Sequence, residues 1–424
     1  MSALSVAPAA RGLQGELRAP GDKSISHRAL LLGALAEGTS RLTGLSTGDD
    51  VAHTAAAVAA CGAEVERVDT VTVTVGGGAE RLHEPAAVVD VGNSGTGIRL
   101  LAGWAAARPW LTVLQGDASI ARRPMGRVAD PLRRMGASVD GRAGGTLPPL
   151  VVRGGRLTGI EHRPEVASAQ VKGAVLLAGL GADGETVVRE PLPTRRHTEE
   201  LLERFGAEVR HDAGWAAVRR SRLAPVELAV PADPSQAAFW VVAASVVPGS
   251  DLRLPRVYVG PGRAAFLDVL RRMGADIRVE GQDPADHTAD LRVRSAGLTA
   301  TTVAGDEVPG LIDEIPVLAV AAAFASGTTT FRDAAELRVK ESDRVETTVA
   351  ALRAVGVVAD GCPDGLVVEG GRPRGGTVDA AGDHRIAMAF AVAGLASPQG
   401  VTIDGWEAVA TSYPGFEEEL NRCA

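Results

Sequence analysis

The chain has 424 residues, of which 45% are hydrophobic, and a formal net charge of −8. A chain of this length is expected to form two domains, and its acidic balance argues against nucleic acid as the main partner, because a phosphate backbone needs a positive face. Three cysteines and eight scattered histidines exclude a disulfide framework and show no metal-site spacing, so a reducing compartment fits and we expect no metal.

The N-terminal region has no apolar core of the signal-peptide type. No uncharged apolar stretch of membrane-spanning length occurs further along the sequence. We therefore expect a cytoplasmic protein without a membrane partner.

Six almost wholly apolar segments recur along the chain, and a turn and a β-branched strand follow each of them. They are residues 29–37, 98–108, 174–182, 237–247, 317–326 and 386–397. Their spacing of roughly 70 residues predicts six repeats that each contain a βαβ motif. A helix that is apolar on every side, as over 315–325, must be buried.

A second pattern alternates with the first. An amphipathic helix ends at a glycine, and a strand follows at once, at Gly62, Gly136, Gly206, Gly274 and Gly356. Glycine at this place is typical of a left-handed helix stop. A sixth copy is expected to begin in residues 416–423.

Six repeats divide naturally into two domains of three. We expect an α/β fold in which each repeat has one buried helix and one outer helix, with sheets around the buried helices. A ring-shaped clamp also uses repeated α/β units. It requires a basic inner face, however, and has no use for acid/base residues in glycine-rich loops.

Lysine is rare in this chain. Of 44 cationic residues only Lys23, Lys172 and Lys340 are lysines, and the rest are arginines. Such a skew suggests a coding bias that replaces lysine wherever arginine will serve. The remaining lysines then mark places that need a compact, titratable ammonium.

The six buried helices all begin in polar loops, at residues 21–28, 92–99, 168–170, 233–236, 311–314 and 382–385. The first turn of a helix normally favours acidic residues. The cations Lys23, Arg28, Arg99 and Arg385 in or near these turns indicate that a ligand supplies the negative charge. We therefore expect a small, multiply charged anion as the partner.

Ordinary helix capping is the alternative interpretation of these loops, and Ser24, Asn93, Ser168 and Asp313 are all suitable caps. Two loops match nucleotide-binding motifs only loosely, over 15–24 and 260–265, so we expect no cofactor. The candidate acid/base residues are Asp313, Glu341, His384 and Lys23, whereas Asp50 and Asp383 are expected to be caps or structural partners.

Taken together, the motifs are highly specific. They read PGDKSISHR at 20–28, GNSGT at 92–96, RPMG at 123–126, SAQ at 168–170, RVKESDR at 338–344 and DHR at 383–385. In this order and over the whole chain, the sequence closely resembles the 5-enolpyruvylshikimate-3-phosphate synthase family.

The resemblance implies two similar domains, each made of three βαβαββ units around buried helices, an inside-out α/β barrel. Two crossovers near Pro20 and Pro231 would hinge them and let them close on substrate. Residues 1–19 with 231–424 would form domain 1, which carries the phosphoenolpyruvate-side and catalytic loops. Residues 20–230 would form domain 2, which binds shikimate 3-phosphate. The family precedent also implies a monomer.

The reaction implied is transfer of the enolpyruvyl group of phosphoenolpyruvate to the 5-hydroxyl of shikimate 3-phosphate. Protonation of the methylene carbon and attack by the hydroxyl give a tetrahedral ketal. Elimination then expels phosphate. This chemistry belongs to the shikimate pathway to chorismate and the aromatic amino acids.

Site residues also follow from the resemblance. The shikimate 3-phosphate site would comprise Lys23, Ser24, Arg28, Ser168, Ala169, Gln170, Arg195, Asp313 and Lys340. The phosphoenolpyruvate site would comprise Lys23, Gly95, Arg123, Gln170, Arg344 and Arg385. Asp313 would be the base for the 5-hydroxyl and Glu341 the proton donor to the methylene carbon, with Lys23 or His384 assisting.

The sequence departs from the family pattern at two places. Many members have Ser where Ala169 stands, and Arg195 would supply the lost phosphate contact. Many have Lys where Thr411 stands, which removes one cation from the phosphoenolpyruvate side. Gly95 is retained, and because Ala there is associated in the family with glyphosate tolerance, we expect sensitivity. Lys172 matches a position without an assigned role and is interpreted as structural.

Two other functions are weighed against this one. The related UDP-N-acetylglucosamine enolpyruvyl transferase carries a Cys where Ala118 stands here, and its acceptor loops do not match Lys23-Ser24. A non-catalytic anion-binding repeat protein is disfavoured because Asp313 and Glu341 are both intact.

Overall fold

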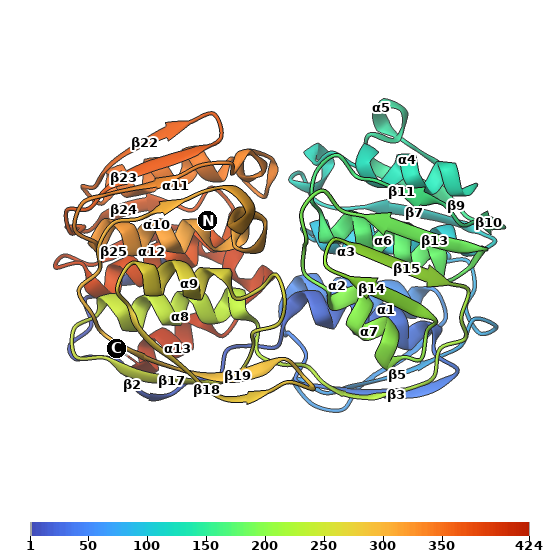
Figure 1. Ribbon diagram of the computed structural model, residues 1–424, viewed down its shortest axis with the longest axis horizontal. Helices are drawn as coiled ribbons and strands as arrows, with labels where there is room; N and C mark the ends of the chain where they lie inside the picture. The colour runs from blue at the N-terminus through green and yellow to red at the C-terminus, as the bar shows by residue number, and fades with distance from the viewer. Residues whose placement is uncertain (1, 424) are drawn as a thin grey trace. The chain divides into compact units, whose positions relative to one another are not determined.

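The fold is given by a computed structural model that describes residues 2–423 (Figure 1). The chain forms two compact units. Unit 1 comprises the residues up to Pro20 and those from Pro231 onward, and unit 2 comprises Gly21–Val230. Both crossovers of the chain between the units therefore lie at a proline.

Unit 2 contains three repeats of a helix, a strand, a second helix and two antiparallel strands. The first repeat has α1 (Lys23–Leu35), β3 (Gly38–Thr43), α2 (Asp49–Ala60), β4 (Glu64–Arg67) and β5 (Val73–Gly77). The second has β6 (Val89–Asp90), α3 (Gly95–Ala106), β7 (Leu111–Gln115), the turn η1 (Ile120–Arg122), α4 (Gly126–Met135), β8 (Ser138–Gly141), α5 (Arg142–Gly145) and β9 (Leu147–Arg153).

The third repeat has β10 (Leu157–Thr158), β11 (Glu161–His162), α6 (Ala169–Gly179), β12 (Ala182–Asp183), β13 (Glu185–Arg189), α7 (His197–Arg204), β14 (Val209–Asp212) and β15 (Trp215–Arg219), and β16 (Glu227–Ala229) ends the unit. Each repeat builds a four-stranded sheet, in the orders β16-β3-β5-β4, β6-β7-β9-β8 and β11-β13-β15-β14. In each sheet the first pair is parallel and the remaining pairs are antiparallel.

Unit 1 repeats the same plan. Its first repeat has β2 (Gln14–Glu16), α8 (Pro234–Val246), β17 (Asp251–Tyr258), α9 (Ala265–Arg272), β18 (Asp276–Asp283) and β19 (Thr288–Arg294). The second has β20 (Thr302–Val303), the turns η2 (Gly305–Gly310) and η3 (Ile312–Glu314), α10 (Ile315–Phe324), β21 (Thr328–Phe331), the turn η4 (Ala335–Val339), α11 (Arg344–Ala354), β22 (Val358–Cys362) and β23 (Gly365–Glu369).

The sixth repeat joins the two ends of the chain. It has β24 (Gly376–Asp379), α12 (His384–Ala396), β25 (Val401–Asp404), the turn η5 (Trp406–Thr411) and α13 (Phe416–Cys423), and β1 (Ala3–Val6) completes its sheet. β1 pairs antiparallel with β25, in the sheet order β1-β25-β24. The expected sixth copy thus begins as a helix at Phe416, and its strand comes from the start of the chain.

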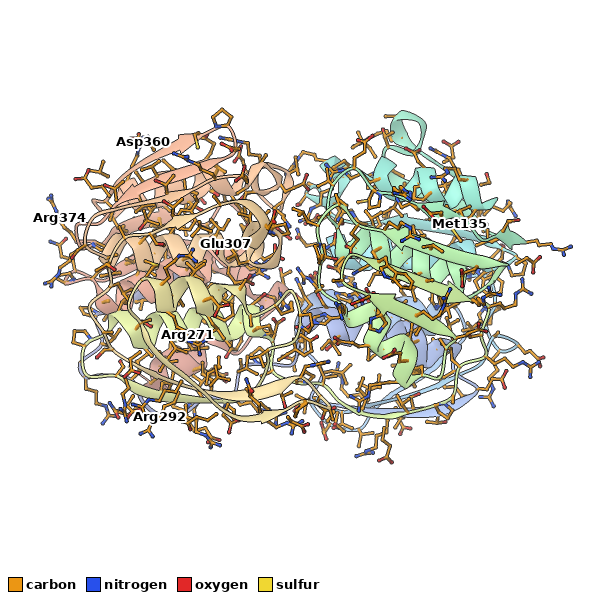
Figure 2. The ribbon with its side chains drawn as sticks, viewed as in Figure 1. Met135, Arg271, Arg292, Glu307, Asp360 and Arg374 are labelled. Atoms are coloured by element: carbon orange, nitrogen blue, oxygen red, sulfur yellow. The ribbon has the colours of Figure 1, made fainter. Side chains whose placement is uncertain are left out.

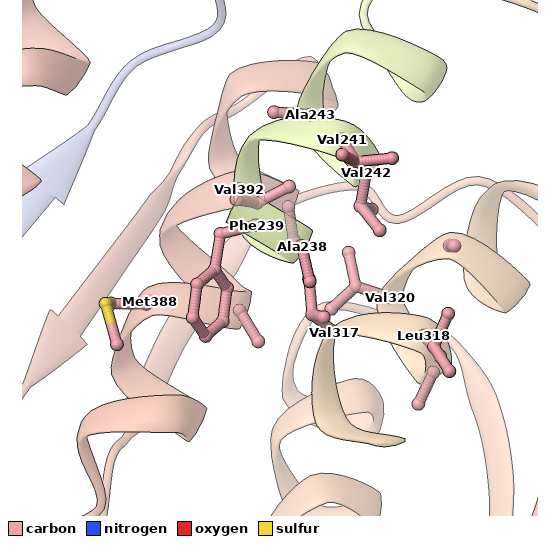
Figure 3. Close-up of a cluster of buried hydrophobic side chains, with 14 of the residues drawn as sticks. Ala238, Phe239, Val241, Val242, Ala243, Val317, Leu318, Val320, Met388 and Val392 are labelled. Atoms are coloured by element: carbon pink, nitrogen blue, oxygen red, sulfur yellow. The ribbon is translucent and has the colours of Figure 1, made fainter. Parts of the chain in front are cut away.

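The core of unit 1 is a bundle of the three apolar helices α8, α10 and α12, which pack on one another (Figure 3). Phe239 of α8, Val317 and Leu318 of α10, and Met388 of α12 are buried in it. In unit 2, α3 packs against both α1 and α6. Charged residues such as Arg271, Asp360 and Arg374 are exposed at the surface of unit 1 (Figure 2).

The predicted helix stops are confirmed. Gly62, Gly136, Gly206, Gly274 and Gly356 have φ angles of 96°, 110°, 79°, 98° and 85°. These values lie in the left-handed region that side chains with a Cβ rarely adopt. The predicted fold class, two domains of three α/β repeats around buried helices, is also confirmed. Across residues 2–423, no helix is both long and apolar enough to cross a membrane.

Candidate active site

The central and outer helices differ in the charge of their first turns. Outer helices α2, α7, α9, α11 and α13 carry acidic residues there, whereas the outer helix α4 carries none. Within the described chain, the first turns of the central helices α1, α3, α6, α8, α10 and α12 carry none. The partial positive charge at the N-termini of the central helices can therefore be balanced only by N-cap residues or by an anionic ligand.

The caps are partly different from those predicted. Asp22 rather than Ser24 caps α1, and Ser94 rather than Asn93 caps α3. Ser168 caps α6 as expected, with its Oγ 3.3 Å from the Val171 N–H. Asp313 lies in the turn before α10 and is no cap. The N-cap is the residue directly before the first helical residue, and in α1 this residue is Asp22, whose carboxylate accepts from the Ile25 N–H. Ser24 and Asp313 are thereby available for other contacts.

Lys23 and His27 share the first turns of α1. The Lys23 Nζ lies 2.8 Å from the Asp50 carboxylate, which is almost fully buried. The Nδ1 of His27 is 2.7 Å from the Thr54 hydroxyl. Burial lowers the pKa of His27 well below its ordinary value, and the nearby cations Lys23 and Arg28 lower it further. His27 is therefore neutral, and the positive charge of this turn belongs to Lys23 and Arg28.

Three chain segments meet at Ser24. Arg28, which is buried, donates to the Ser24 carbonyl at 2.9 Å and to the Ala169 carbonyl at 3.4 Å. The Arg195 Nη1 donates to the Ser24 hydroxyl at 3.2 Å. The predicted residues Ser24, Arg28, Ala169 and Arg195 are thus brought together, with one guanidinium on the Ser24 carbonyl and another on the Ser24 hydroxyl. Such an arrangement suits a phosphate.

A second group of predicted residues continues from the first. The Gln170 Oε1 accepts from Arg99 Nη1 at 2.7 Å, and the same nitrogen donates to the Gly95 carbonyl at 3.0 Å. A Cβ on Gly95 would overlap the Arg123 Nη1. A Cβ here would therefore require the end of the Arg123 side chain to shift, whereas the backbone angles of Gly95 do not call for glycine.

In unit 1, Asp313 receives two cations. Its Oδ1 lies 3.1 Å from Lys340 Nζ and 3.3 Å from Arg344 Nη1. The Glu341 carboxylate lies 2.5 Å from Arg344 Nη2. The two predicted acid/base carboxylates thus share one guanidinium, which places them in one electrostatic system.

Arg344 is held from its inner side by Asp383, with Nε 2.8 Å from Oδ2, and both side chains are fully buried. Burial alone would lower the pKa of Arg344, but the carboxylates of Asp383, Glu341 and Asp313 outweigh burial and raise it. Burial likewise works to raise the pKa of Asp383, and the Arg344 charge overcomes it and lowers that pKa. The pair is fully charged. Asp383 is a structural partner and also the cap of α12.

Arg385 and His384 open α12, and both are buried. The Arg385 Nη1 donates to the Asp313 carbonyl at 3.0 Å and lies 3.6 Å from Glu314. Four predicted residues, Asp313, Lys340, Arg344 and Arg385, are therefore in direct contact. Thr411, the second predicted departure from the family pattern, ends the turn η5.

Sequence analysis missed several residues that hold the site. Arg99 was noted as a cation but not as a partner of Gln170. Thr198 accepts from Arg28 Nε at 2.7 Å, and Glu314 accepts from Ser235. No local signal identifies Thr198. For Glu314, an acidic residue at the mouth of a wholly apolar helix was a usable signal. No group of three or more candidate metal ligands occurs within residues 2–423.

Comparison with known proteins agrees with this architecture. The family model for "EPSP synthase (3-phosphoshikimate 1-carboxyvinyltransferase)" matches residues 8–420. A 3-phosphoshikimate 1-carboxyvinyltransferase of Gloeobacter violaceus is 53% identical, covering 99% of this chain and 98% of its own. One of Synechococcus sp. (strain JA-3-3Ab) is 51% identical, covering 99% and 96%.

Solved structures show the same relationship. An EPSP synthase from Acinetobacter baumannii is 41% identical, with a TM-score of 0.88 over 100% of this chain and 98% of its own. The enolpyruvyl transferase NikO from Streptomyces tendae shares the fold, with a TM-score of 0.80 at 21% identity over 99% and 97% of the two chains. The family match over the whole length and the sequence identity lead to one conclusion: this chain belongs to the EPSP synthase family.

Proposed function

We propose that this chain transfers the enolpyruvyl group of phosphoenolpyruvate to the 5-hydroxyl of shikimate 3-phosphate and releases phosphate. The family membership supports this reaction. The observation that carries it at the level of residues is the shared guanidinium of unit 1, since Arg344 contacts both Asp313 and Glu341. One cation thus holds a proposed base and a proposed acid.

In unit 2 the residues around Ser24 are suited to hold the shikimate phosphate. Arg28 and Arg195 both contact Ser24. This arrangement supports the role of Arg195 as the donor that compensates for Ala169. Ser168 and Gln170 at the start of α6 complete the proposed shikimate 3-phosphate ligands of unit 2. In unit 1, Lys340 is also proposed as a ligand of this substrate.

In unit 2, Lys23, Gly95, Arg123 and Gln170 are proposed as ligands of phosphoenolpyruvate. In unit 1, Arg344 and Arg385 are proposed for the same role. The close approach of Arg123 to Gly95 supports this assignment. A side chain at Gly95 would overlap the Arg123 guanidinium, a proposed phosphoenolpyruvate ligand, and require it to shift. Sensitivity to glyphosate follows as a prediction, and competition with phosphoenolpyruvate in the assay below tests it.

In the proposed mechanism, Glu341 gives a proton to the methylene carbon, and the 5-hydroxyl oxygen attacks the adjacent carbon. Asp313 takes the hydroxyl proton, which leaves a tetrahedral ketal. Loss of a proton from the new methyl group then restores the double bond as the carbon–oxygen bond to phosphate breaks. Lys23 and His384 would assist these proton transfers.

The first prediction concerns phosphate release from purified protein. Release with phosphoenolpyruvate should depend on shikimate 3-phosphate and should be absent with UDP-N-acetylglucosamine as acceptor. Lys23→Met should lower kcat by about a hundredfold or more, since it removes a preorganised charge from the reacting groups. Release that is independent of shikimate 3-phosphate would contradict the proposal.

Loss of Lys23 also leaves Asp50 as a buried carboxylate without its ammonium, which destabilises the fold. The double variant Lys23→Met/Asp50→Asn is therefore the matched control. It should unfold near the wild-type temperature and stay inactive. An active double variant would show that Lys23 serves only to neutralise Asp50.

A monomeric state and a cytoplasmic location are proposed from the family precedent. Light scattering on the purified chain tests the first, and a dimer would contradict it. Fractionation of the source cells tests the second.

A further inference from the structure

Lys172 is the one lysine that the proposed reaction does not use. It lies in the first turns of α6, and its side chain is 2% exposed. Its Nζ is 2.8 Å from the Glu190 carboxylate and 2.7 Å from that of Glu199. Both carboxylates are as deeply buried as the ammonium, so the three charges form one closed group.

The two glutamates bracket a loop. Glu190 directly follows β13, and Glu199 is in the first turn of α7. The intervening residues 191–196 contain Arg195, the proposed phosphate ligand. By contacting both glutamates, Lys172 joins the start of this loop to the helix that follows it.

The contacts continue from the glutamates to the phosphate site. The Thr194 hydroxyl donates to the Glu190 carboxylate, and the Thr194 N–H lies 3.4 Å from the same carboxylate. Thr194 immediately precedes Arg195, whose Nη1 reaches the Ser24 hydroxyl. On the other side, Glu199 follows Thr198, which accepts from Arg28.

We infer that Lys172 is a positioning residue that holds Arg195 and Arg28 in place for the shikimate phosphate. This inference rests on the proposed function of those two arginines. Lys172 itself reaches neither substrate nor reacting atoms. Its ammonium aligns Glu190 and Glu199, and these fix the residues beside the two arginines.

This role also explains why the position is lysine in a chain so rich in arginine. A compact ammonium directs its three N–H donors in different directions, whereas a guanidinium is planar and larger. At 2% side-chain exposure the group has no room for the extra atoms. Lys172→Arg should therefore fail to restore the function of the wild-type residue.

A double-mutant cycle tests the inference, with the Kd for shikimate 3-phosphate measured by titration calorimetry. Lys172→Met should raise this Kd by about 10- to 100-fold, the cost of misplacing a charge-assisted hydrogen bond. In an Arg195→Gln background the same change should raise the Kd by a smaller factor, because only the positioning of Arg28 is then left to lose. In both backgrounds, the KM for phosphoenolpyruvate should change by a smaller factor than the Kd for shikimate 3-phosphate.

Two outcomes would overturn the inference. One is an equal loss of affinity with and without Arg195, which would mean that Lys172 acts independently of it. The other is a parallel rise in the KM for phosphoenolpyruvate, which would indicate general damage to the fold. If Arg195→Gln leaves the Kd unchanged in an active enzyme, the assignment of Arg195 is wrong, and this inference fails with it although the activity stands.

Folding is controlled separately, since Lys172→Met leaves two buried carboxylates without their cation. Glu190→Gln keeps the shape of the group and should show the same coupling to Arg195 with a smaller amplitude. The triple variant Lys172→Met/Glu190→Gln/Glu199→Gln removes all three charges together. Arg210→Gln, which breaks an exposed pair with Glu185 in the same unit, should leave the Kd unchanged.

Discussion

At the scale of residues, every lysine of this chain donates to a carboxylate. Lys23 pairs with Asp50, Lys172 with Glu190 and Glu199, and Lys340 with Asp313, at distances from 2.7 to 3.1 Å. Composition alone indicated that these positions needed an ammonium. It did not indicate the partners, because each carboxylate lies far from its lysine in the sequence. The rarity of a residue type thus located three important positions.

His27 carries a prediction about pH. Its pKa is held well below the ordinary value of 6.5 by burial and by the charges of Lys23 and Arg28. Below pH 6.5, His27 therefore binds a proton in the unfolded chain but stays neutral in the folded chain until the pH is much lower. The contribution of His27 to the free energy of unfolding is therefore fully present above pH 6.5. It is lost as the pH is lowered toward the pKa of the folded state, by at most about 1.4 kcal/mol per pH unit for one proton.

Chemical denaturation of wild type and His27→Gln between pH 5 and pH 8 measures this effect. The variant is expected to be less stable throughout, since His27 is buried against Thr54. Its stability should nevertheless depend less steeply on pH below 6.5. Parallel curves for the two proteins would show that His27 is charged in the folded state, contrary to its surroundings.

At the scale of elements, the six central helices and the glycine stops could be predicted because both are local patterns. An apolar run such as Ile315–Phe324 can only be buried, and a glycine before a strand marks a left-handed turn. The pairing of β16 with β3 could not be predicted. Strand partners are chosen by packing across the whole unit, and no local pattern records them. The same holds for the contact between Thr198 and Arg28 in the candidate site.

Helix α10 provides a prediction of stability. Leu318 of α10 is fully buried in the hydrophobic core of unit 1. Leu318→Ala should lower the free energy of unfolding of unit 1 by about 2–5 kcal/mol, through lost burial and the cavity left behind. Val358→Ala on β22 is the control, since Val358 is 61% exposed and should change stability by less than about 0.5 kcal/mol.

Thermal and denaturant unfolding of the two variants checks this prediction. An equal loss of unfolding free energy in both variants would mean that the buried Leu318 stabilises the fold no more than the exposed Val358 does. A loss confined to Leu318→Ala would support the prediction that helices without a polar face supply the core of each unit.

At the scale of the molecule, unit 2 is one continuous stretch of chain, whereas unit 1 needs both ends. Residues 21–230 contain every strand of their three four-stranded sheets, including β16, and both strands of the small β10-β12 sheet. Unit 1 takes β1 and β2 from the N-terminal segment, where Leu13 and Leu17 are buried in its core. Although the two units share one architecture, unit 2 can therefore form from one continuous segment, whereas unit 1 requires two separate segments of the chain.

The prediction is that residues 21–230 fold alone with a cooperative thermal transition. Residues 231–424 alone should aggregate, because the edges of β17 and β25 that β2 and β1 cover would be open. Addition of a peptide of residues 1–20 should restore solubility and a transition. A cooperative fold of 231–424 without the peptide would contradict the role given to β1 and β2.

The pairing of β1 with β25 has a consequence for biosynthesis. Residues 3–6 are synthesised long before their partners, residues 401–404. Strand β1 therefore stays without its partner strand while residues 21–230 are synthesised and fold. It can pair only after β25 has been made, and until then the nascent chain carries an unpaired β-strand edge.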